Sequence, residues 1–200
     1  MYSAAQRLAG ATQHRQGRYQ EALKAHGDAY SAAAQIGDRW NMAQCRAWQA
    51  YALHAHGRSQ DSLSAVHAAL RLIPETEDLH GTSLRGRLLT SGAMYAAQLR
   101  DTKHASSMLQ ASEALLHRLD APTEEFDQAV WLEAAGVYAL HLGQLDLAAA
   151  RFRQAFDSTP ASRKSERVLL SIALTRALAP FSALTQPTLP GAVLATANRC

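Results

Sequence analysis

Residues 143–156 read GQLDLAAARFRQAF and form the clearest copy of a unit that recurs along the chain. Ala148, Phe152 and Ala155 stand five, nine and twelve positions after Gly143, a spacing that places them on one face of a helix. Glycine closes a helix at little steric cost because it takes the left-handed conformation readily. We therefore expect Gly143 to form a turn between two helices that approach closely at the alanines.

The same register starts again at three other positions, Gly17, Gly57 and Arg100, and the four starts are 40, 43 and 43 residues apart. A small residue stands seven positions before each start, and a residue that fills space stands nine after it in each unit. The small residues are Gly10, Ala50, Ala93 and Gly136; the filling residues are His26, Val66, Leu109 and Phe152. Each unit therefore predicts two helices whose small residues face one another where the helices cross.

This pattern predicts an all-α chain in which glycines and prolines end the helices. The expected helices are 3–16, 18–35, 41–56, 58–72, 82–99, 101–118, 123–142, 144–158 and 162–178. The acidic runs at 75–78 and 124–127 are expected in first turns, where negative charge suits the helix dipole, with Thr123 as a cap. Trp48, Trp131 and Cys45 are expected in the core, and Trp40 is expected to precede its helix.

The set Gly136, Gly143, Ala148, Phe152, Ala155 and Pro160 resembles the tetratricopeptide repeat (TPR), although the units are longer than the usual ~34 residues. Ser62, His26 and the Arg100 turn depart from that pattern in the other units. The resemblance implies an α-solenoid of about four helix-turn-helix repeats plus a C-terminal capping helix. Its repeats are 3–36, 41–74, 82–118 and 123–160, with the cap at 162–178, in one domain, 1–178, followed by an irregular tail at 179–200.

The resemblance also implies a concave face lined by the first helix of each pair, on which a protein or peptide partner binds. The residues expected to bind it are Arg7, His14, Gln44, Tyr51, His54, Arg87, Thr90, Met94, Glu133 and Val137. The other groove positions are Ala4, Ala11, Ala47, Ala97, Val130 and Leu140. The alternative is a merely solvated surface. Neither Lys nor Asn occupies the positions with which chaperone-tail binders of this family clamp a carboxylate.

The units are rich in Ala, Arg, Leu and Gln and resemble the TPR sensor regions of actinobacterial helix-turn-helix transcriptional regulators. This implies a non-enzymatic regulatory or sensor module of a bacterial protein, without a DNA-binding domain of its own because Met1 leads directly into the first unit. The alternative is a self-assembling scaffold, in which the apolar tail at 181–200 or an uncapped first helix joins a homodimer.

Motifs for catalysis, cofactors or phosphate binding do not occur in the sequence, so we expect neither an enzyme nor a cofactor. His54 and His56 would point to opposite sides of a helix and could not chelate one metal, whereas His14 and His54 could be neighbours on the groove. The net charge of +3 comes from dispersed Lys and Arg, which argues against direct nucleic-acid binding. Without a leader or an apolar run of ~18 residues, we expect a cytoplasmic protein that does not bind membranes.

Overall fold

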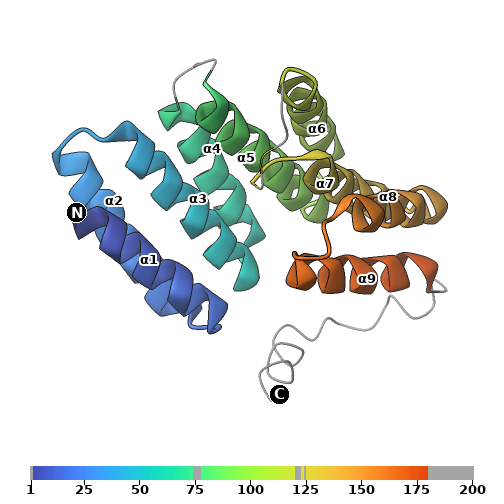
Figure 1. The fold of residues 1–200 in the computed structure, drawn as a ribbon, viewed down its shortest axis with the longest axis horizontal. Coiled ribbons are helices and arrows are strands. Elements are labelled where there is room, and N and C mark those ends of the chain that lie inside the picture. The colour runs from blue at the N-terminus through green and yellow to red at the C-terminus, as the bar shows by residue number, and fades with distance from the viewer. Residues whose placement is uncertain (1, 74–77, 120–122, 124, 180–200) are drawn as a thin grey trace.

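The computed structural model describes residues 2–73, 78–119, 123 and 125–179, which form nine α-helices and no strand (Figure 1). The helices are α1 (Tyr2–Arg15), α2 (Tyr19–Gln35), α3 (Arg39–Ala55), α4 (Ser59–Leu72), α5 (Leu79–Gln98), α6 (Thr102–Leu116), α7 (Gln128–His141), α8 (Leu145–Ser158) and α9 (Lys164–Leu178). The all-α class is confirmed. The predicted helix boundaries are correct to within three residues, with one exception at the start of α7.

Helices that are adjacent in sequence are joined by short connections and pack side by side, as α1 with α2, α3 with α4, α5 with α6 and α7 with α8. Between these pairs, α2 packs on α3 and α4 packs on α5, while α5 also contacts α7 directly. Most helices thus pack against the helices that precede and follow them in sequence, and the last helix, α9, packs against α8 (Figure 1). This arrangement brings α3, α5, α7 and α9 around one hollow.

All four predicted turns within the pairs share one backbone geometry. The N–H of Gly143 donates to the carbonyl of Leu140 at 3.0 Å, and the N–H of Gln144 donates to the carbonyl of Ala139 at 3.0 Å. These two hydrogen bonds define the Schellman motif that closes a helix through a left-handed residue. The same pair of bonds and a positive φ recur at Gly17, Gly57 and Arg100, and also at Gly37 between α2 and α3.

In the first and fourth pairs, the small residue of the first helix meets the filling residue of the second helix, as predicted. The fully buried ring of His26 lies against Gly10, where an added Cβ would be 2.5 Å from the ring Cε1, and Phe152 meets Gly136 in the same way. In the third pair the contact is shifted by one residue, because Met108 rather than Leu109 packs against Gly92. Leu109 is buried in the main core cluster instead.

The start of α7 corrects the prediction, which placed residues 123–127 in the helix with Thr123 as its cap. The helix begins at Gln128 and is capped by Asp127, whose carboxylate accepts from the N–H of Val130 at 3.0 Å. Thr123 instead accepts from the N–H of Phe126 at 3.0 Å within a preceding turn. The physical reason is that the fully buried Phe126 ring packs against Gly86 of α5 and holds this turn outside the helix.

Other expectations for single residues have mixed outcomes. Asp78 caps α5 by accepting from the N–H of Gly81 at 2.8 Å, whereas residues 75–77 and 124 lie outside the described residues. Cys45 is fully buried, as expected. Trp40 lies inside α3 rather than before it, packed against the main core cluster. The tail at 180–200 also lies outside the described residues, and no described helix is long and apolar enough to cross a membrane.

Candidate functional site

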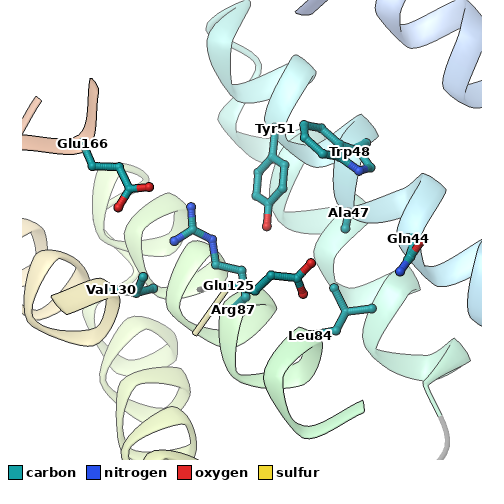
Figure 2. A pocket seen from close by; sticks show the side chains of 9 residues that line it. All are labelled: Gln44, Ala47, Trp48, Tyr51, Leu84, Arg87, Glu125, Val130 and Glu166. Carbon is teal, nitrogen blue, oxygen red and sulfur yellow. The ribbon is translucent and has the colours of Figure 1, made fainter. Parts of the chain in front are cut away.

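A hollow of about 340 Å³ opens between α3, α5, α9 and the start of α7 (Figure 2). Its lining residues are Gln44, Ala47, Trp48 and Tyr51 of α3, Leu84 and Arg87 of α5, Glu125 and Val130 at the start of α7, and Glu166 of α9. The four residues of α3 follow a three-and-four spacing and therefore share one helix face. The hollow exists only because segments far apart in the sequence converge on it.

The α3 wall of the hollow is aromatic and is held in place by ring contacts. The rings of Trp48 and Tyr51 meet edge to face, with centroids 5.7 Å apart and planes at 89°. On its other side, Trp48 stacks on the buried His26 ring at 5.8 Å with an interplanar angle of 13°. Such aromatic contacts favour fixed orientations. The two rings therefore offer a preformed surface to the hollow.

Arg87 supplies the cation of the hollow, and its side chain is partly buried. The guanidinium lies 5.9 Å from the centroid of the Tyr51 ring and hydrogen-bonds the Tyr51 hydroxyl, which points toward it in Figure 2. Burial disfavours this cation, but Tyr51 and the Glu133 carboxylate outweigh burial and raise the pKa of Arg87. Burial also raises the pKa of Glu133, against the opposing effect of the Arg87 charge.

Two exposed carboxylates complete the hollow, and both extend into it in Figure 2. Glu166 lies 3.4 Å from Nη1 of Arg163, measured from its Oε2 atom. Among the described residues, Glu125 makes no ion pair within 4.0 Å, and neither does Arg87. The lining therefore holds one cation and two anions.

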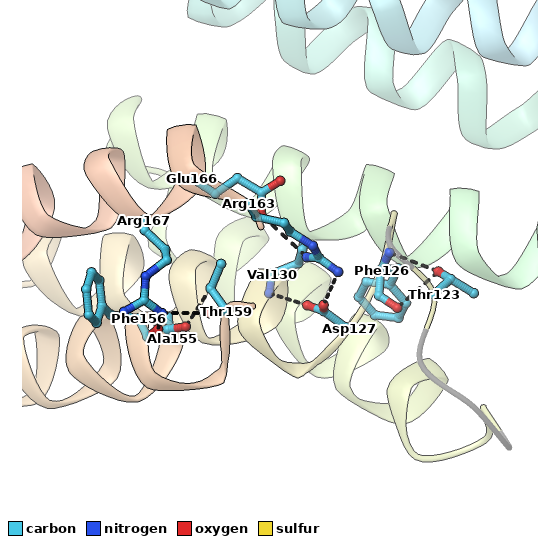
Figure 3. A network of polar contacts seen from close by, with 10 residues as sticks. All are labelled: Thr123, Phe126, Asp127, Val130, Ala155, Phe156, Thr159, Arg163, Glu166 and Arg167. Atoms are coloured by element: carbon cyan, nitrogen blue, oxygen red, sulfur yellow. Dashed lines mark hydrogen bonds and ion pairs between the residues drawn. The ribbon is translucent and has the colours of Figure 1, made fainter. Parts of the chain in front are cut away.

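The position of α9 depends on a polar network at the start of α7 (Figure 3). Nη2 of Arg163 lies 2.9 Å from Oδ2 of Asp127, and both side chains are largely buried. Arg167 donates to the carbonyls of Phe156 and Thr159 at 2.9 and 2.7 Å and stacks over the Phe156 ring at 3.8 Å. Asp127 thus caps α7 and binds α9 at once, which fixes Glu166 opposite α3.

Three of the ten predicted groove residues line the hollow, namely Gln44, Tyr51 and Arg87, and Glu133 lies near them, where its charge acts on Arg87. Thr90 does not, because it is fully buried and its hydroxyl donates to the carbonyl of Arg87 at 2.9 Å within its own helix.

The other predicted groove residues lie elsewhere. Met94 and Val137 pack against core clusters, and the side chain of Arg7 lies outside the described part of the chain. His14 and His54 contact different rings, since His14 meets Tyr19 and Trp48 whereas His54 meets Tyr95 at 4.5 Å. His56 is exposed.

Four lining residues were not predicted as groove residues: Trp48, Leu84, Glu125 and Glu166. Trp48 was expected in the core but is only partly buried. Trp48 and Leu84 stand three or four residues from predicted groove positions, so a wider face of each helix would have included them. Glu125 lies in the acidic run that was assigned to a helix. Glu166 belongs to the expected capping helix, for which the repeat register gives no groove position.

Two comparisons with known proteins gave no match. No protein-family model matches the chain, and no curated protein matches it. Within the described residues, no group of three or more His, Cys, Asp or Glu side chains is placed to hold a metal ion. What the hollow can bind therefore follows from the residues that line it.

Proposed function

We propose that this chain is a non-enzymatic binding module of TPR type, an α-solenoid of about four helix pairs with a capping helix, that holds a protein or peptide segment in the hollow. The observation that carries the proposal is the hollow itself, where an aromatic wall faces a partly buried guanidinium from another helix. Aromatic residues and arginine dominate the binding energy of many protein interfaces.

The size of the hollow suits one or two side chains of a bound segment. Its volume of about 340 Å³ lies near the lower end of the range for small-molecule sites, about 300–1,000 Å³. One or two side chains fill such a space, and the rest of the partner would lie along the neighbouring helices. The recurring Schellman turns and glycine contacts support the repeat interpretation on which this geometry depends.

The residue types in the hollow favour binding over catalysis. Its described lining contains amide, phenol, guanidinium and carboxylate groups, but no Ser, Thr, Cys or His that could form a nucleophile–base pair. The resemblance to the sensor regions of helix-turn-helix regulators supports a place for this module in a bacterial regulatory system.

A displayed library of random twelve-residue peptides, selected on the purified chain, tests this function. Gln44→Trp fills the hollow from a partly exposed position, so we expect it to weaken selected peptides by about tenfold or more. The matched control is Gln110→Trp on the exposed face of α6, which should leave their affinity unchanged. Peptides that bind both variants equally, or a selection that enriches none, would refute the proposed site.

A second candidate, self-assembly, is favoured by an apolar face on α9. Val168, Leu169 and Ile172 are exposed there, at 59%, 57% and 37% of their possible surface, which is unusual for three neighbouring large apolar residues. Light scattering over a range of concentrations separates the candidates. A homodimer that dissociates on Leu169→Glu would support the scaffold, and a strict monomer would remove it.

A further inference from the structure

The charges around the hollow identify what kind of side chain it takes. Resting on the proposed function, we infer that the bound segment places a lysine or arginine side chain in the hollow, with its cation between the aromatic wall and the carboxylates of Glu125 and Glu166. The carboxylates lie on two separate segments, the turn before α7 and helix α9, and both line the hollow, on either side of the Arg87 side chain in Figure 2.

Arg87 makes no ion pair within 4.0 Å among the described residues, but groups of the protein already interact with its charge. Glu133 on α7 attracts it, and the Tyr51 hydroxyl accepts its hydrogen bond. Arg163 is matched by direct ion pairs, because it lies 2.9 Å from Asp127 and 3.4 Å from Glu166. Of the charged groups that line the hollow itself, one is a cation, Arg87, and two are anions, Glu125 and Glu166, so the lining carries an excess of negative charge.

Glu125 is the carboxylate of the hollow whose charge is not matched by an ion pair among the described residues. It is exposed, and it borders an apolar floor formed by Leu84 and Val130. An acidic side chain in the hollow would meet this carboxylate and that of Glu166 at close range and be repelled. A basic side chain meets two opposite charges there.

The shape and polarity of the lining fit a basic side chain along its whole length. Long basic residues lay their methylene stems on apolar surface while the charged end seeks polar groups. Ala47, Leu84 and Val130 provide that surface. The faces of Trp48 and Tyr51 attract a cation through their ring electrons, and this attraction strengthens where water is partly excluded. An apolar side chain would use the stem surface but leave the Glu125 carboxylate without an ionic partner, while Glu166 would keep its contact with Arg163 at 3.4 Å.

A positional-scanning library of hexapeptides, acetylated and amidated so that the ends carry no charge, tests the inference. Peptides are scored by how strongly Gln44→Trp weakens their binding relative to Gln110→Trp. We expect lysine or arginine to dominate one position of the peptides that depend on the hollow, and norleucine at that position to weaken binding about threefold to tenfold. Hollow-dependent peptides without a basic residue would overturn this inference while leaving the proposed function intact. No hollow-dependent peptide at all would overturn both.

Two variants locate the cation within the hollow. Glu125→Gln and Glu166→Gln should each weaken the lysine peptide by about threefold to fivefold, with a smaller effect at high salt because the carboxylates are exposed. They should not change the affinity of the norleucine peptide. Glu113→Gln, on α6 beside a separate hollow, is the matched control and should change neither. Equal losses for both peptides, or no loss for the lysine peptide, would place the cation elsewhere and overturn the inference.

Discussion

Phe152 of α8 packs against Gly136 of α7 so closely that a Cβ on the glycine would lie 2.7 Å from Cε1 and 2.8 Å from Cδ1 of the ring. The ring is fully buried and cannot swing away without displacing its neighbours. The distance between α7 and α8 is therefore set by the absence of a side chain at 136. Gly10 and His26 stand in the same relationship between α1 and α2.

Gly136→Ala should consequently lower the free energy of unfolding by about 1–3 kcal/mol, because the new methyl group overpacks the crossing. Urea unfolding followed by circular dichroism measures this change. Gly27→Ala is the matched control in α2, where an added Cβ meets only Nε2 of Gln49 at 3.8 Å. That control should be neutral or raise stability by up to about 1 kcal/mol. An equal response of both variants would contradict the packing argument.

The third turn carries a residue that its backbone disfavours. Arg100 has φ of 61°, whereas glycine occupies the equivalent positions with φ of 74°, 78° and 74°. Arg100→Gly should raise stability by about 0.5–1 kcal/mol, because a side chain in the left-handed conformation costs more than the added freedom of glycine. The reverse change, Gly143→Ala, should lower it by about 1 kcal/mol. No atom lies within 4 Å of the added Cβ at 143, so melting both variants isolates the backbone effect.

The ion pair between Arg163 and Asp127 should matter more than an exposed pair, because the side chains are only 16% and 12% exposed. Arg163→Met leaves the Asp127 carboxylate buried without its partner and should cost about 2–4 kcal/mol. Asp127→Asn keeps an N-cap acceptor for Val130 and should cost less. Differential scanning calorimetry compares the two. A smaller loss for Arg163→Met than for Arg18→Met, in an exposed pair with Glu21, would refute this role.

Stability should fall in mild acid. Burial lowers the pKa of His54 from its usual 6.5, and burial also lowers the pKa values of His14 and His141. The unfolded chain therefore binds more protons than the folded chain just below pH 6.5. The stabilisation is complete above that pH and is lost as pH falls through the folded pKa values.

A single substitution tests how much His54, which packs on Tyr95, contributes to the loss of stability in acid. His54→Gln should make the loss of stability between pH 7 and pH 5 smaller by about 1 kcal/mol, measured by urea unfolding at each pH. His56→Gln, two residues away and exposed, provides the comparison and should leave the loss unchanged. The idea fails if the two variants show the same pH dependence.

The sequence predicted the helices because local rules govern them. Glycine at the turns, small residues at the crossings and spacing by three and four located the described helices to within a few residues. The start of α7 was missed because Phe126 packs against Gly86, some forty residues earlier, and this contact overrides the local preference of the acidic run for a helix.

The hollow was only partly predictable for a related reason. The register identified Gln44, Tyr51 and Arg87, which share the faces of their own helices. The repeat register assigned Thr90 to the groove, but in the structure this residue of α5 is fully buried. It could not find Glu166, which lies in α9 beyond the last repeat, or Glu125, which lies in the turn before α7 where Phe126 packs against Gly86.

By itself, therefore, the sequence determined which segments are helical, where they turn and which small residues allow close packing, because these depend on neighbours within about four positions. Tertiary structure alone decided which charges share one space. Trp48, Arg87, Glu125 and Glu166 come from four segments, and their convergence depends on how α5 contacts α7 and how α9 docks on α8 and on the start of α7. Electrostatic complementarity acts through space, so it emerges only when the chain has folded.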